Sequence, residues 1–343
     1  MRATPPLLID SLKALASQLI VLHHLAFYGP MSDHMAQWLP ELIDWLYADA
    51  RMAVQVFLVI GGFLAAQTLS VARPDTRLAR MLWQRYQRLA FPLFAALVLA
   101  IAAAALARHI LPHPATPAAP SLWQMLSHLL LAQQVFGQES LSAGVWYVTI
   151  DFQLYATYLL LLHLSQRLQL PPLYAPLLLT AASLYVFNCM PALDIYAPYF
   201  FGAYGLGILA HHLSKSRHFW PGLLLLALLG SSALLLDFRA RISIALVCAL
   251  LLACCRLLPV LPGRLALISP LARISYALFL VHYPVCLVVN AVFGRWVAPA
   301  PLPQLAGMLL AWALSLAAAF LFHHHVEKRL TTSASSAKIA LPA

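Results

Sequence analysis

The sequence is poor in charged residues. Of its 343 residues, 9% are charged and 62% are hydrophobic, whereas soluble domains carry about 25% charged residues. This composition excludes an ordinary soluble domain. The apolar runs are long and unbroken rather than alternating, which also excludes a transmembrane barrel. The sequence therefore predicts an all-α, polytopic membrane helix bundle.

Cysteine is scarce as well. The five cysteines lie mostly within apolar runs and form no spacing framework, so neither structural disulfides nor a metal cluster is expected. The first apolar run contains Lys13 and a histidine pair, and no small-residue cleavage site follows it, so no cleavable signal peptide is expected. The net charge of +10 is explained by the membrane topology, and we expect no nucleic-acid partner.

About ten segments have the length needed to cross a bilayer, roughly 20 apolar residues each. They are centred near residues 12–30, 52–72, 89–108, 145–164, 173–189, 196–213, 221–236, 242–258, 273–291 and 304–323. Most lysines and arginines fall in alternate loops, which predicts that both termini are cytoplasmic. The opposite side keeps about five basic residues, namely Arg51, Arg108, Arg239, Arg241 and Arg295.

Two segments outside the predicted spans are amphipathic. Residues 31–50 are expected to form a loop or short interfacial helix, and residues 109–140 contain a proline-rich run followed by an amphipathic stretch. Residues 1–330 are expected to form a single membrane domain in the inner (plasma) membrane. The tail 331–343 is small and polar, which is typical of disorder.

Ionisable side chains interrupt the first predicted span. Such groups are costly in a bilayer, so their default interpretation is functional. Asp10, Lys13 and His24 share one helix face, with Lys13 and His24 about 16 Å apart along the axis, whereas His23 points about 100° away. Imidazole titrates near neutrality and suits a general base, which makes His24 the candidate. The alternative is a core histidine that donates to a carbonyl. For His23 we expect a packing or orienting role.

A basic pair stands at the start of the third predicted span. Arg85 and Arg88 are three residues apart, so both project from one side of a helix. Guanidinium groups bind phosphate oxygens bidentately, which suits a multivalent phosphate ligand. Ordinary positive-inside retention with anionic lipid contact is the alternative.

Two further spans carry polar residues at helical spacing. Tyr147, Asp151 and Tyr155 form a stripe, and an intramembrane Asp151 needs a partner such as His24 or an arginine. An interfacial aspartate within an aromatic belt is the alternative. Later in the chain, residues 275 and 282 are a serine and a histidine seven residues apart, so they share a face. Packing is the alternative there.

Other repeated residues favour no metal or phosphate site. The consecutive histidines at 211–212 and 323–325 point about 100° apart around a helix, so they cannot converge on one ion. Gly61 and Gly62 favour a close helix contact over a phosphate loop.

Taken together, these segments resemble the membrane acyltransferase-three family of O-acyltransferases acting on surface sugars and polysaccharides. The resemblance covers roughly residues 8–330 and rests on an ordered series of segments. These are Asp10-Ser-Leu-Lys through His24, Val56 through Leu64, Arg85 through Pro92, Trp146 through Tyr155, Ser275 through Pro284, and Val326-Glu-Lys328. Three positions depart from the family pattern: Lys13 stands where Arg is usual, Gly61 replaces Ser, and Asp151 replaces Glu.

The resemblance implies an activity and a site. Acyl-CoA, most often acetyl-CoA, is the expected co-substrate, with no permanently bound cofactor and no metal, and a saccharide is the expected acceptor at the bilayer. His24 would act as general base or acyl relay with Asp151 as its catalytic partner. Substrate or acyl-CoA binding would fall to Asp10, Lys13, Arg85, Arg88, Tyr147, Tyr155, Ser275 and His282. A transporter or flippase, and a non-catalytic family member, stay open as alternatives, and so does the oligomeric state.

Overall fold

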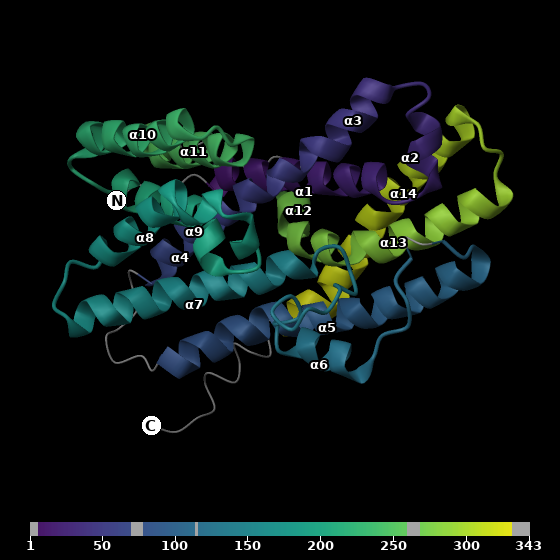
Figure 1. The fold of residues 1–343 in the computed structure, drawn as a ribbon, viewed down its shortest axis with the longest axis horizontal. Helices are drawn as coiled ribbons and strands as arrows, with labels where there is room; N and C mark the ends of the chain where they lie inside the picture. Colours follow the sequence, from purple (N-terminus) through teal and green to yellow (C-terminus); the bar gives the residue numbers. More distant parts are fainter. Residues whose placement is uncertain (1–5, 70–77, 114–115, 259–267, 331–343) are drawn as a thin grey trace. The chain divides into compact units, whose positions relative to one another are not determined.

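We describe the chain from a computed structural model, which covers residues 6–69, 78–113, 116–258 and 268–330 (Figure 1). Within these ranges the chain forms helices joined by turns and loops and no strand, which confirms the all-α prediction. The predicted tail 331–343 lies outside them.

The described residues form a series of α-helices. They are α1 Pro6–Phe27, α2 Pro30–Met35, α3 Pro40–Ala48, α4 Val54–Leu69, α5 Leu78–Ile110, α6 Leu122–Leu129, α7 Val145–Arg167, α8 Tyr174–Tyr185, α9 Ala197–Ser214, α10 Phe219–Leu236, α11 Ala240–Ala253, α12 Ile268–Arg273, α13 Ser275–Trp296 and α14 Pro301–Phe322. Short 3₁₀ turns lie between or after these helices, namely η1 Ala50–Ala53, η2 Phe187–Cys189, η3 Pro191–Leu193 and η4 Cys254–Leu257, and a π turn, η5 His323–Glu327, follows α14.

Seven helical stretches in the described part of the chain are long and apolar enough to cross a membrane, so the protein is a multi-pass membrane protein. They are Pro40–Leu69, Leu78–Ile110, Val145–Arg167, Phe219–Leu236, Ala240–Leu257, Ser275–Trp296 and Pro301–Leu330. The other three predicted spans, near residues 12–30, 173–189 and 196–213, form α1, α8 and α9. The count of ten stays a prediction.

The two amphipathic segments and the third predicted span differ in detail from the sequence-based boundaries. Residues 31–50 form two short helices, α2 and α3, and α6 occupies the amphipathic part of 109–140. Helix α5 begins at Leu78, eleven residues before the predicted span. Its 33 residues rise about 50 Å at 1.5 Å per residue, more than the roughly 30 Å hydrocarbon core of a bilayer. The helix is therefore longer than the apolar layer is thick.

The chain divides into two compact units. The first contains Met1–Ala16, Met52–Leu82 and Thr149–Ala272. Within it, α4 and α9 cross closely: a Cβ added at Gly62 would lie 1.9 Å from the carbonyl oxygen of Tyr204, and one at Gly207 would lie 2.0 Å from that of Val59. No side chain larger than hydrogen fits at either position. This confirms the prediction that the glycine pair in α4 makes a close helix contact.

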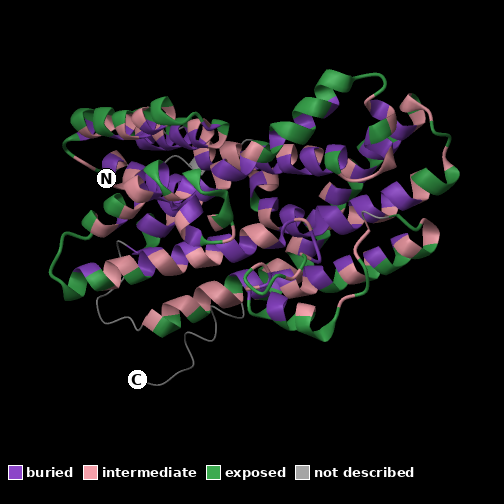
Figure 2. Ribbon diagram, viewed as in Figure 1, coloured by how far each residue is buried: buried purple, intermediate pink, exposed green. Residues whose placement is uncertain are grey.

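The second unit contains Ser17–Arg51, Trp83–Val148 and Arg273–Ala343. Helix α14 packs against α13 and α2 in this unit. Most of α13 is buried, as its largely purple ribbon shows (Figure 2). The hydroxyl of Tyr276 at the start of α13 donates to the carbonyl oxygen of Leu89 in α5, 2.7 Å away. This bond attaches the beginning of α13 to the middle of α5.

Candidate active site

Two histidines from distant parts of the sequence meet in the second unit. His24 lies on the last full turn of α1 and His282 on the third turn of α13. The Nδ1 atom of His24 lies 2.9 Å from Nε2 of His282, and the ring centroids are 4.8 Å apart. Both side chains are buried, and His282 is completely so. The sequence singled out each histidine but not their pairing.

The neighbours of His282 determine which nitrogen of each ring carries a proton. Nδ1 of His282 lies 2.9 Å from the carbonyl oxygen of Leu278, which can only accept, so Nδ1 carries the proton. In a neutral ring Nε2 of His282 is then an acceptor, and Nδ1 of His24 donates to it. The remaining nitrogen of His24, Nε2, therefore keeps its lone pair. This is the form that a general base requires.

Aromatic rings surround the histidine pair. Tyr28 stacks on His24 with ring centroids 5.7 Å apart and an interplanar angle of 18°. Phe279 lies on the other side, 6.3 Å from His282, and Tyr147 meets Phe279 edge to face at 5.2 Å. Tyr147, a predicted site residue, thus lies one ring away from His282. No sequence pattern indicated that Tyr28 belongs to this site.

The adjacent His23 has a different environment from His24. Its Nδ1 donates to the carbonyl oxygen of Leu46 in α3, 3.0 Å away, and its ring contacts Phe27 at 5.7 Å. His23 therefore attaches α1 to α3, as expected for a packing residue. The 100° separation between successive helical residues explains why two neighbours differ so strongly.

In the first unit, Asp151 lies beside the glycine pair of α4. Its Oδ1 is 3.5 Å from the point where a Cβ at Gly61 would stand, and the ring of Tyr204 is 3.3 Å from the same point. Asp151 is buried, and Tyr155, one turn further along α7, is buried as well. Two residues after Asp151, the side-chain oxygen of Gln153 accepts from the backbone N–H of Ala197 at the start of α9. The carboxylate therefore faces the position where the family pattern has a serine hydroxyl.

The predicted phosphate-binding pair lies on α5. Arg85 is half-buried and Arg88 is exposed, and Leu89, which follows Arg88, accepts the hydrogen bond from Tyr276. His282 follows Tyr276 by six residues of α13, about 9 Å of helical rise. Buried Ser275 lies at the first position of α13. The basic pair thus lies near the level of the start of α13, with the histidine pair two turns further along.

The predicted site residues fall into both units. Asp10, Lys13, Asp151 and Tyr155 belong to the first, and Arg85, Arg88, Tyr147, Ser275, His24 and His282 belong to the second. Lys13 and His24 nevertheless lie on one continuous helix, so their shared face and spacing follow from α1 itself. The expected pairing of Asp151 with His24 stays a prediction.

A comparison with known protein families shows which family the chain belongs to. Residues 8–324 match the family described as Acyltransferase domain. The chain belongs to this family. No curated protein matches it, and neither does any solved structure. The match covers α1 through α14 and confirms the resemblance seen in the sequence, so the chain is a membrane acyltransferase in general terms.

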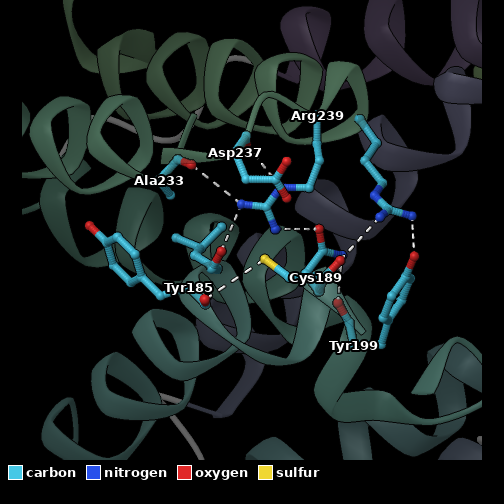
Figure 3. A network of polar contacts seen from close by, with 9 residues as sticks. Tyr185, Cys189, Tyr199, Ala233, Asp237 and Arg239 are labelled. Carbon is cyan, nitrogen blue, oxygen red and sulfur yellow. Dashed lines mark hydrogen bonds and ion pairs between the residues drawn. The ribbon is translucent and has the colours of Figure 1, made fainter. Parts of the chain in front are cut away.

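Two arginines of this acyltransferase form a polar network in the first unit (Figure 3). Buried Arg239 donates to the side-chain oxygen of Asn188 at 2.9 Å and to the carbonyl oxygen of Leu184 at 2.8 Å. Arg241 donates to the carbonyl oxygen of Asn188 at 3.1 Å and to the hydroxyl of Tyr199. The guanidinium groups thus satisfy carbonyls at the end of α8 and in η2. We interpret them as structural.

The consecutive histidines of the acyltransferase do not converge. His211 packs its ring edge-on against Phe63 at 5.0 Å, and His323 pairs with Glu327 at 2.8 Å within one turn. In the described part of the chain, no group of three or more histidine, cysteine, aspartate or glutamate side chains is placed to hold a metal ion.

Proposed function

We propose that this protein is an O-acyltransferase that moves an acetyl group from cytoplasmic acetyl-CoA to a hydroxyl of a cell-surface or exported saccharide. It does so in the inner membrane, with about ten spans and both termini in the cytoplasm. The observation that carries the proposal is the His24–His282 contact, because it leaves Nε2 of His24 unprotonated. Family membership supports acyl transfer as the reaction class.

His24 acts as general base in this mechanism. Its Nε2 removes the proton from the acceptor hydroxyl while the oxygen attacks the thioester carbonyl. The tetrahedral intermediate then expels the CoA thiolate, which takes the proton back from His24. One C–O bond forms and one C–S bond breaks, so the products are an ester and CoA. His282 holds the productive tautomer of His24 during the first step and accepts a stronger hydrogen bond once the ring is charged.

The donor is bound from the cytoplasmic side. Arg85, Arg88 and Lys13 would neutralise the phosphates of the nucleotide. Lysine makes a point-charge contact where arginine would make a fork. The Lys13–His24 spacing of about 16 Å then separates the charged end of the donor from the reacting thioester. Asp10, Tyr147, Tyr155 and Ser275 complete the predicted binding residues.

Asp151 is the second catalytic residue of the proposal. Its buried carboxylate serves to orient the imidazole or to hold the acceptor hydroxyl. Asp151 is one methylene shorter than the glutamate usual at this position. Gly61 beside it removes the usual serine hydroxyl, so both departures from the family pattern lie at one place.

The adjacent histidines provide a matched test. Purified protein in nanodiscs is supplied with acetyl-CoA and a saccharide acceptor, and CoA release is followed. His24→Gln is expected to lower kcat by about 10²- to 10⁴-fold, the usual contribution of a general base. His23→Gln should leave kcat near the original value, because a glutamine amide can still donate to Leu46. Equal losses in the two variants, or full activity of His24→Gln, would remove His24 from the mechanism.

The same assay separates the alternatives. A transporter or flippase would release no CoA, and neither would a non-catalytic family member. Sequential kinetics with both substrates support direct transfer, whereas ping-pong kinetics with an acylated protein would place the acyl group on His24. For the donor site, Arg85→Ala should raise the KM for acetyl-CoA, and Arg217→Ala, at the α9–α10 turn, should not.

A further inference from the structure

Asn290 has a buried polar atom with no hydrogen-bond partner in the part of the chain that the structure describes. The residue lies on α13, two turns after His282, and is 6% exposed. Its Nδ2 donates to the carbonyl oxygens of Tyr28, at 2.8 Å, and Cys286, at 3.0 Å. Its Oδ1 is buried and accepts no hydrogen bond from the described residues. A buried acceptor left in this state costs about as much as a lost hydrogen bond.

The orientation of this amide is fixed by its partners. Both groups that Nδ2 contacts are backbone carbonyls, which can only accept. Rotating the amide by 180° would place oxygen against oxygen at both contacts. Oδ1 must therefore face away from these two carbonyls, on the side where no described residue donates to it.

A small pocket lies at this amide. Its lining includes Tyr28, Gly29, His113, Thr116 and Asn290, and the space is partly open. The cavity has a volume of about 20 Å³, which takes one group the size of a water molecule or a hydroxyl. Gly29 has a φ of +108°, and a Cβ there would stand 2.2 Å from Oδ1 of Asn290. Any residue larger than glycine at position 29 would therefore collide with the amide of Asn290.

The pocket is one aromatic ring away from the proposed base. Tyr28 lines the pocket and stacks on the ring of His24. The lining contains no aspartate, glutamate, lysine or arginine, so it offers a neutral ligand an amide acceptor, hydroxyl groups and an aromatic face. Under the proposed topology, the ends of α1, α5 and α13 that form it lie on the external side, from which the acceptor arrives.

We infer that this pocket anchors the acceptor: Oδ1 of Asn290 accepts a hydrogen bond from a hydroxyl of a neutral saccharide whose neighbouring hydroxyl is presented to His24. The inference rests on the proposed function for the identity of the reaction, and it adds the place where the acceptor is held. A single hydroxyl enters the enclosed space, and the rest of the sugar lies in its open part. Thr116 supplies a second polar contact on the opposite segment.

The test compares two buried side-chain amides, those of Asn290 and Gln304. Asn290→Leu removes the pocket acceptor. Gln304→Leu is the matched control, because Gln304 is also a buried α-helical amide that donates to one backbone carbonyl and leaves its oxygen unpartnered, but it does not line the pocket. The probes are methyl glycosides of glucose, galactose, mannose, rhamnose and N-acetylglucosamine. Binding to protein in nanodiscs is measured by saturation-transfer NMR, and acetyl transfer is measured by CoA release.

For the best-bound glycoside, Asn290→Leu is expected to weaken binding and raise the acceptor KM by about 5- to 100-fold, the effect of losing a buried hydrogen bond. The KM for acetyl-CoA should stay unchanged, and Gln304→Leu should match the original protein. Thr116→Val is a milder change in the same pocket, and its glycoside binding is measured as well in case Asn290→Leu does not fold. Two results would refute saccharide binding in this pocket and show that it holds water only. One is equal glycoside binding in the original protein and both pocket variants, and the other is no glycoside binding at all. Glycoside binding that is weakened by the pocket substitutions, in a protein that releases no CoA, would support saccharide binding in the pocket and refute only the acetyl-transfer proposal.

Discussion

His282 is expected to control the tautomer of His24, and replacing it tests that role directly. In His282→Leu, the leucine side chain fills the space of the imidazole but cannot accept the Nδ1 proton of His24. The Nδ1 proton then loses its partner in His282, so the tautomer with the proton on Nε2 becomes more populated. The lone pair that accepts the substrate proton is lost in this tautomer.

The magnitude follows from the cost of the lost hydrogen bond. Leaving a buried donor unsatisfied costs about 1–3 kcal/mol, and each 1.36 kcal/mol corresponds to a factor of ten in rate. We therefore expect His282→Leu to lower kcat by about 5- to 150-fold. His282→Gln should lose much less, because its side-chain oxygen can accept from His24.

The assay is CoA release under saturating donor and acceptor, with both KM values measured. A positioning role predicts lower kcat with little change in either KM, and rescue by glutamine. His163→Leu, on α7, is the control for inserting a leucine in place of a histidine within a span. Equal loss in the leucine and glutamine variants, or a leucine variant with full kcat, would refute the tautomer argument.

Three further predictions concern helix packing, the carboxylate and pH. Gly62→Ala should lower the free energy of unfolding by about 1–3 kcal/mol, measured by thermal unfolding in detergent, because its Cβ would overlap a backbone carbonyl. Gly61→Ser should raise kcat severalfold, because its hydroxyl can donate to Asp151, which stands 3.5 Å from the new Cβ. Burial lowers the pKa of His128 below 6.5, and its neutral ring accepts from the backbone N–H of Leu141. Its contribution to stability should be complete above about pH 6.5 and decline as the pH falls, because the unfolded chain binds the proton first.

Each of these predictions has a control that separates it from a general effect. Gly222→Ala should be milder than Gly62→Ala, because its Cβ meets the flexible end of Leu213 instead of backbone. Gly61→Ala should not raise kcat, and a gain there would show that the hydroxyl is irrelevant. His128→Gln should flatten the decline of Tm with falling pH, whereas exposed His109→Gln should leave it unchanged. A decline that persists in His128→Gln would assign the effect to another group.

Local sequence patterns predicted a large part of this fold. The apolar runs located the helices, because helix formation depends on neighbours within one turn or two. The 100° step between adjacent residues separated His24 from His23, and the glycine pair in α4 indicated a close crossing. Helix α5 begins at Leu78, eleven residues before the apolar span predicted near 89–108, since the basic residues at its beginning interrupt the apolar pattern without interrupting the helix.

The candidate site was only partly visible in the sequence. Asn290 is a polar residue inside a predicted span, and the cost of burying it could have drawn attention to it. Tyr28 carried no such signal, because aromatic residues are common near membrane interfaces. Its role depends on the ring that it stacks against.

The sequence by itself determined that this chain is a helical membrane protein of an acyltransferase family, and which helix face carries His24. These properties depend on composition, helical period and motif order, all of which are local. Only the tertiary structure decided that His24 meets His282, 258 positions away, and that Asn290, whose amide oxygen has no partner among the described residues, lines a pocket. Helical periodicity fixes the direction of a side chain on its own helix. Packing between helices decides which group it meets, and so which nitrogen of His24 is free to accept a proton.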